Sequence, residues 1–198
     1  LLVGKILRKQ GSMISGKVAT YIKKDFVKYF RNIDYSKTIF VTGTNGKSTT
    51  TNLIAHTIKS AGKTLATNTE GANMMSGIAT TLVKNSNLFG KFNKEFLILE
   101  IDERSLHAIH KLLPAVNLCI SNLQKDQVQR NGDPDFIYRM FADTITKNMT
   151  LFVNNEEPRS RSLENYVGKV VYYSMQKNEK TYEKDDFYTV TLPCPKCN

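Results

Sequence analysis

A glycine-rich turn followed by a lysine and a serine is the segment of this sequence best suited to chemistry. It follows a short β-branched run at residues 38–42 and precedes a helix-forming stretch. A strand that ends in such a turn and opens a helix presents backbone N–H groups and the positive end of the helix dipole to an anion. We therefore predict a site for ATP, with Lys47 reaching the β- and γ-phosphates and the Ser48 hydroxyl binding Mg²⁺. The expected ATP ligands of this turn are Gly43, Thr44, Asn45, Gly46, Lys47, Ser48 and Thr49.

The turn is a shortened form of the general phosphate-loop pattern. That pattern has a glycine five residues before Gly46, where this sequence has Val41. A glycine turn that binds nothing is the alternative interpretation. The preceding strand, the following helix and the Lys-Ser pair favour phosphate binding.

An acidic residue stands where a metal ligand is expected. Glu100 ends the apolar run at residues 95–101, which is typical of a buried strand. Ligands of parallel sheets sit beyond the carboxyl ends of the strands. We predict that Glu100 helps to bind Mg²⁺ and acts with Lys47 in catalysis, although Asp102 and Glu103 compete for the same role. Asp126 is a second acidic candidate.

Strand and helix patterns alternate along the chain, which predicts an α/β fold with a doubly wound, mostly parallel sheet. The strands are expected at residues 38–42, 64–67, 95–101, 115–120, 150–153 and 170–173. The helices are expected at residues 17–31, 48–60, 75–85, 104–112 and 135–148.

Composition indicates a globular protein with an uneven charge. The 198 residues are 40% hydrophobic and carry a net charge of +10. Residues 1–40 hold nine Lys or Arg against two Asp, which suggests an anionic partner such as a phosphorylated substrate, a membrane surface or nucleic acid. A solvated helix face is the alternative. No apolar run is long enough for a bilayer, so we expect a cytoplasmic protein in which Cys119 is a buried free thiol.

The last part of the sequence has a different character. Residues 176–186 are polar, residues 187–192 predict a strand, and Cys194 and Cys197 follow as a CxxC pair. In a cytosolic protein this pair points to a metal before a disulfide. Two cysteines cannot close a tetrahedral zinc site, so Cys194 and Cys197 would be half of one.

Several segments together resemble the Mur ligases and folylpolyglutamate synthetases, and in particular the MurT branch of the Mur ligases. The segment at residues 43–50 resembles the ATP loop of the whole group. The segments at 11–17, 71–78 and 122–132 resemble MurT proteins, whereas Gln127 departs from the histidine that amino-acid-adding ligases usually carry. The segment at 154–158 resembles the family's turn near the nucleotide base. The match covers essentially the whole chain.

The resemblance implies a fold, a reaction and partners. The fold would be the Mur ligase central domain at residues 38–175, preceded by a basic helical segment at 1–37 and followed at 176–198 by the first arm of a zinc-ribbon insertion. The reaction would be ATP-dependent amidation of the D-glutamate α-carboxyl of lipid II, through an acyl phosphate, in peptidoglycan synthesis. A glutaminase subunit, GatD, would supply ammonia, and lipid II would be met at the inner face of the membrane. The resemblance assigns Asn154 to the nucleotide and Asn73, Asp126 and Arg130 to the substrate.

Members of this branch are longer than this chain. They carry a four-cysteine zinc ribbon and a C-terminal domain with a catalytic acid, which is absent here. We therefore expect a fragment or a natural truncation, with doubtful activity of its own. The alternatives are an amino-acid-adding Mur or folylpolyglutamate ligase and an inactive nucleotide-binding remnant. Nucleic-acid binding is disfavoured, because no aromatic–basic recognition motif accompanies the positive charge.

Overall fold

Six parallel strands form one sheet in the order β2-β3-β1-β4-β5-β6. The computed structural model describes residues 14–68, 72–123 and 134–174. Val41 of β1 lies opposite Glu100 of β3 on one side and Cys119 of β4 on the other. The strands are β1 Thr38–Thr42, β2 Leu65–Thr67, β3 Phe96–Glu100, β4 Asn117–Ile120, β5 Thr150–Asn154 and β6 Lys169–Tyr173.

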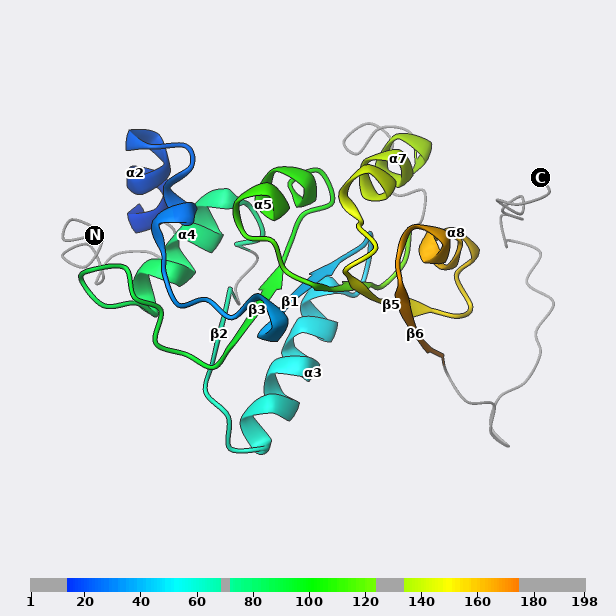
Figure 1. Cartoon of the computed structure of the whole chain (residues 1–198), viewed down its shortest axis with the longest axis horizontal. Coiled ribbons are helices and arrows are strands. Elements are labelled where there is room, and N and C mark those ends of the chain that lie inside the picture. Colours follow the sequence, from blue (N-terminus) through cyan, green and yellow to red (C-terminus); the bar gives the residue numbers. More distant parts are fainter. Residues whose placement is uncertain (1–13, 69–71, 124–133, 175–198) are drawn as a thin grey trace.

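The helices cover the two faces of the sheet unequally. Figure 1 shows α3 on one side of the sheet and α4, α5 and α7 on the other. The α-helices are α2 Ile14–Ile22, α3 Lys47–Ser60, α4 Met75–Lys84, α5 Leu106–Leu112, α7 Pro134–Thr144 and α8 Pro158–Ser162. Three short 3₁₀ helices are η2 Phe26–Tyr29, η3 Tyr35–Lys37 and η4 Leu163–Tyr166.

Side chains along the strands point alternately to the two faces of the sheet, which divides the core into two clusters. Phe40, Leu99 and Leu118 are fully buried in the larger cluster, with residues of α4, α5 and α7. Their strand neighbours Val41 and Ile98 are fully buried in the smaller cluster, which α3 covers through Ile54 and Ile58. Because successive side chains of a strand point to opposite faces, β1, β3, β4 and β5 each contribute to both clusters.

The topology reverses direction at β1. From β1 the chain passes through α3 to β2 at the edge of the sheet and returns to β3, and from β3 it crosses to β4 on the other side of β1. The carboxyl end of β1 is therefore a topological switch point, the place where parallel sheets of this kind bind their ligands. The glycine turn leaves β1 at this point.

The predicted α/β fold is confirmed, and all the strand pairs described are parallel. The helix predicted at residues 17–31 is wrong, because α2 ends at Ile22 and only a 3₁₀ turn, η2, follows. Leaving the helix lets Val27 and Phe30, which are 0% and 5% exposed, enter the larger cluster. The helix α7 ends at Thr144, before the predicted 148, and α8 and η4 were not predicted. The strand predicted at 187–192 lies outside the described residues.

Cys119 is a buried free thiol, as predicted, and burial raises its pKa to about 11. Within the described ranges, no helix combines the length and the apolar character needed to cross a bilayer.

Candidate functional site

The glycine turn is fixed by its own backbone and by the chain after β4. Gly43 has φ +126° and Gly46 has φ +79°, which are conformations that other residues rarely adopt. A Cβ atom on Gly43 would lie 2.3 Å from the Ser121 hydroxyl oxygen, so this position also requires the absence of a side chain. Gly46 is the residue that precedes α3. The sequence therefore folds here into the turn that the phosphate-loop pattern requires.

Hydrogen bonds join the turn to the residues after β4. The Thr44 amide donates to the Asn122 carbonyl at 2.9 Å, and the Asn45 amide donates to the Asn122 side chain at 3.0 Å. The Ser121 hydroxyl donates to the Asn45 carbonyl at 2.6 Å. The turn is thus held open at the start of α3, where the amides of the first helical turn can receive an anion.

Lys47 is held by its own loop and by a buried acid. Its ammonium donates to the carbonyls of Gly43 at 2.6 Å and Thr44 at 3.0 Å, and it pairs with Glu103 Oε1 at 3.2 Å. The two side chains are only 15% and 7% exposed. Burial raises the pKa of Glu103 and outweighs the opposing influence of the Lys47 charge. Glu103 is therefore a buried carboxylate whose only charged partner in the described structure is the lysine of the loop.

Glu100 lies beside Ser48 at the carboxyl end of β3. The Ser48 hydroxyl donates to Glu100 Oε2 at 2.7 Å, and the Asn73 amide group donates to Oε1 at 3.2 Å. Glu100 is 5% exposed. A hydroxyl and a carboxylate in contact are hard oxygen donors of the kind that Mg²⁺ prefers, with nucleotide phosphates and water completing its shell. These two side chains fit Mg²⁺, and no cluster of three or more acidic, His or Cys side chains forms a separate metal site among the described residues.

Two other residues define the surroundings of Glu100. Asn68, which is 2% exposed, donates to the Glu100 carbonyl at 2.7 Å and accepts from the Glu100 amide at 2.8 Å. Asp102 instead accepts from the Arg104 amide at 3.1 Å and so stabilises the turn after β3. The three acids of this run therefore have different partners. Glu100 faces Ser48, Glu103 faces Lys47, and Asp102 closes a turn.

The remaining predicted site residues are only partly described. Asn154 ends β5, and its side chain accepts from the Glu156 amide at 3.0 Å. Nearby Glu157 is 6% exposed and accepts from the Ser160 amide at 2.7 Å and from the Leu123 amide at 3.3 Å. It caps α8 and ties it to the chain after β4. The other four predicted residues, Asp126, Arg130, Cys194 and Cys197, lie outside the described part of the chain.

Sequence reasoning missed Asn68 and the pairing of Glu103 with Lys47. Asn68 follows β2 with no motif around it, and only the parallel pairing of β2 with β3 brings it to Glu100. The acid of the pair was visible in the run after β3, but its partner is 56 residues away in sequence. The cap at Glu157 had a signal, since an acidic residue followed by proline is typical of a helix start.

Comparison with known proteins adds three findings. The sequence profile of the Mur ligase middle domain matches residues 41–192. The MurT subunit of the glutamine-hydrolysing lipid II isoglutaminyl synthase of Staphylococcus aureus is 31% identical over 191 residues, which cover 96% of this chain and 42% of that protein. The corresponding Streptococcus pneumoniae subunit is 32% identical, over 95% of this chain and 41% of its own length. The chain thus spans about two-fifths of these relatives.

A solved structure shares the fold. The MurF ligase of Thermotoga maritima, in a complex with ADP, aligns with a TM-score of 0.60 and 15% identity, over 81% of this chain and 36% of that chain.

Proposed function

The chain belongs to the Mur ligase family, and on this premise we propose that it carries the ATP site of a ligase that activates a carboxyl group as an acyl phosphate. The observation that carries the proposal is the arrangement at the switch point. Lys47 and Ser48 are the first residues of α3, directly after the glycine turn. Glu100 accepts a hydrogen bond from the Ser48 hydroxyl at 2.7 Å. Phosphate, a neutralising cation and a metal ligand would meet there.

Each group has a defined role in this proposal. The amides at the start of α3 and the Lys47 ammonium bind the phosphates and neutralise the charge that spreads over the transferring phosphoryl group. Ser48 and Glu100 would hold Mg²⁺, which would help to neutralise the negative charge of the phosphates. Asn68 and Asn73 orient Glu100 through the hydrogen bonds described above. The Asn154 side chain would lie near the nucleotide base, and Asn73, Asp126 and Arg130 would contact the acceptor.

We further propose that the acceptor is the D-glutamate α-carboxyl of lipid II. The carboxylate oxygen attacks the γ-phosphorus and ADP leaves, which converts a poor electrophile into an acyl phosphate. Ammonia from a glutaminase subunit of the GatD type then attacks the acyl carbon. Phosphate leaves, and the product is D-isoglutamine, the α-amide of D-glutamate. The similarity to the two MurT subunits supports this assignment, and Gln127 in place of histidine supports it against an amino-acid-adding ligase.

The proposed division of the chain follows the same similarity. Residues 38–175 form the ATP-binding domain, residues 1–37 form a basic segment before it, and residues 176–198 begin a zinc ribbon. Cys194 and Cys197 would supply two of its four ligands. The relatives on which this division rests are more than twice as long as this chain.

The proposed reaction has a direct test. The full-length protein would be mixed with a soluble lipid II analogue, ATP, Mg²⁺ and an ammonium salt in place of the glutaminase. Mass spectrometry should show one carboxyl hydroxyl replaced by an amino group, together with ADP formation. ADP formation that requires a free amino acid in place of ammonia would instead identify an amino-acid-adding ligase. A chain that binds ATP and makes neither product would be a nucleotide-binding remnant.

A further inference from the structure

One end of the molecule exposes apolar side chains among lysines. Tyr21 and Ile22, at the end of α2, are 92% and 75% exposed, and Phe89 and Leu88, in the loop after α4, are 78% and 48% exposed. Three of the four most exposed large apolar side chains described therefore lie in these two segments. We define this end surface by the residues Tyr21, Ile22, Lys23, Lys24, Lys28, Tyr29, Arg31, Leu88, Phe89 and Lys91.

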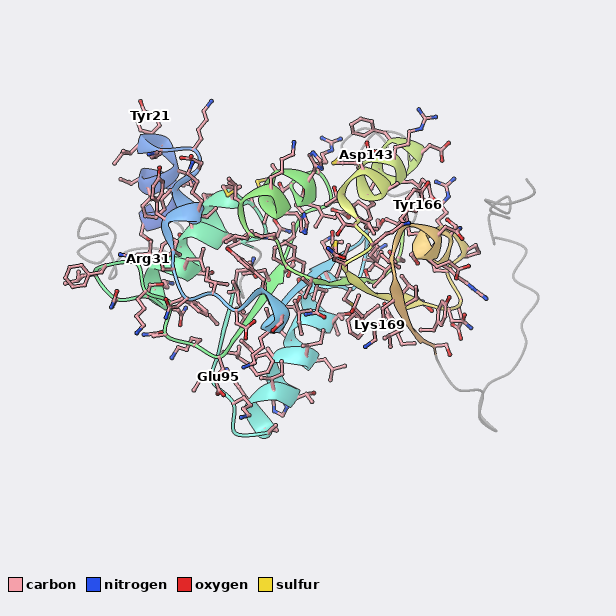
Figure 2. The ribbon with its side chains drawn as sticks, in the orientation of Figure 1. Tyr21, Arg31, Glu95, Asp143, Tyr166 and Lys169 are labelled. Carbon is pink, nitrogen blue, oxygen red and sulfur yellow. The ribbon has the colours of Figure 1, made fainter. Side chains whose placement is uncertain are left out.

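The two segments are joined by a backbone bridge at Arg31. The Arg31 amide donates to the Gly90 carbonyl at 2.9 Å, the Phe92 amide donates to the Arg31 carbonyl at 2.9 Å, and the Arg31 guanidinium donates to the Phe89 carbonyl at 3.2 Å. Figure 1 shows α2 and the loop after α4 at the same end of the molecule, and Figure 2 shows Tyr21 and Arg31 there. Val27 and Phe30 anchor the first segment in the core. The end surface is therefore a fixed part of the fold.

The end surface is strongly positive. Residues 14–31 contain five Lys or Arg and one acid, Asp25, and residues 85–94 contain two lysines and no acid. These 28 residues carry six of the ten net positive charges of the chain. Asp25 is itself paired with Lys28, and the ammonium groups of Lys23 and Lys28 lie 4.4 and 5.5 Å from the centroid of the Tyr29 ring. Little negative charge is left to repel an anionic partner.

We propose that the end surface binds an anionic membrane. Exposed aromatic and aliphatic side chains partition into the headgroup region of a bilayer, while neighbouring lysines are attracted to anionic lipids. Nucleic acid would also attract the lysines, and bases could stack on Tyr21 or Phe89. However, nucleic acid gives no comparable role to the aliphatic Ile22 and Leu88, which favours the membrane. Membrane binding by this surface does not depend on the proposed reaction. A failure of the membrane test would leave the proposed reaction standing, and a failure of the reaction test would leave membrane binding standing.

Co-sedimentation with lipid vesicles tests the proposal. The chain should pellet with phosphatidylcholine vesicles that contain phosphatidylglycerol and remain in solution with phosphatidylcholine alone, and added salt should weaken the binding. The substitution Lys23→Glu/Lys24→Glu should weaken binding by about tenfold or more. Tyr21→Ser/Ile22→Ser leaves every charge in place and should also weaken binding, because it removes the inserted side chains.

Matched changes elsewhere on the surface provide the controls. Lys111→Glu/Lys147→Glu reverses two exposed lysines outside the end surface, and Phe136→Ser removes an aromatic ring that is 59% exposed on α7. Both control variants should bind vesicles like the parent chain. The proposal would be overturned if the control variants lost as much vesicle binding as the end-surface variants, or if the chain bound uncharged vesicles equally well. It would also be overturned if a random DNA duplex displaced the vesicles. A chain that ignores vesicles and forms dimers through Tyr21 and Ile22 would overturn it as well. Nucleotide affinity, measured on the same variants, should remain unchanged.

Discussion

Replacing Lys47 should affect both nucleotide binding and the stability of the fold, because its ammonium is the charged partner of a buried acid. Lys47→Met keeps most of the apolar stem and removes the charge. Phosphate oxygens would then face only backbone dipoles, and ATP affinity should fall at least tenfold, or about 1.4 kcal/mol. The same substitution leaves Glu103 buried without its ion pair.

The size of the second effect follows from burial. The two side chains are 15% and 7% exposed, so the pair is not screened as a surface pair would be. Removing one partner of a buried ion pair costs about 3–5 kcal/mol. Lys47→Met/Glu103→Gln removes both charges, so it should recover most of that stability and none of the ATP affinity. The double variant thus separates the structural role of Lys47 from its role in binding phosphate.

The destabilisation should also depend on pH. Burial already places the pKa of Glu103 above its usual range, and loss of the Lys47 ammonium raises it further. The unfolded chain then loses this proton at a lower pH than the folded chain does. Stability of Lys47→Met should therefore fall as pH rises through the folded-state pKa, and its deficit should be larger near pH 8 than at about pH 5.

Urea unfolding of the parent chain and the two variants at both pH values measures these effects, and calorimetry measures ATP binding. A deficit below about 1 kcal/mol at the higher pH, or a double variant no more stable than Lys47→Met, would refute the inference that Glu103 depends on Lys47. Unchanged ATP affinity in Lys47→Met would refute the placement of phosphate at the loop.

Three further substitutions or analyses test other parts of the site. Glu100→Gln should raise the Mg²⁺ concentration needed for nucleotide binding, whereas Asp102→Asn should not, and the opposite order in a Mg²⁺ titration would show that the wrong acid was chosen. Gly43→Ala should destabilise the fold by about 1–3 kcal/mol in urea unfolding, because φ is +126° and a Cβ atom would lie 2.3 Å from a hydroxyl oxygen; a stability equal to that of the parent chain would show that the turn adapts. Metal analysis should find only weak zinc binding to Cys194 and Cys197 in this chain and one tightly held zinc per chain in the full-length protein. Tight stoichiometric zinc in the monomeric 198-residue chain would contradict the half-site interpretation.

The sequence predicted the parts of the site that depend on local backbone. Gly43 and Gly46 are required by the turn itself, the β-branched run at residues 38–42 predicts a strand, and the apolar run at residues 95–101 predicts a buried strand. These features can be recognised from a few neighbouring residues, because backbone dihedral preferences and the hydrophobic pattern depend on the local sequence. Glu100 could be placed as well, since the ends of parallel strands meet at one edge of the sheet.

The sequence did not predict the contacts that register and packing create. The pairing of Lys47 with Glu103, and of Asn68 with Glu100, depends on which strands are neighbours and on how far each extends. The end of α2 at Ile22 has the same origin. Residues 17–31 have a helical hydrophobic pattern, but α2 ends at Ile22, and Val27 and Phe30 are buried in the larger cluster from the 3₁₀ turn η2 and the residue after it.

The most direct test of the central claim is a crystal structure of the chain with Mg²⁺ and a non-hydrolysable ATP analogue. We expect phosphates at the amides of Lys47 and Ser48, with the Lys47 ammonium turned towards them. We also expect a metal ion in contact with the Ser48 hydroxyl and with Glu100, directly or through water. A nucleotide bound away from the start of α3, or a metal ion held by Asp102 without Ser48 and Glu100, would contradict the central claim.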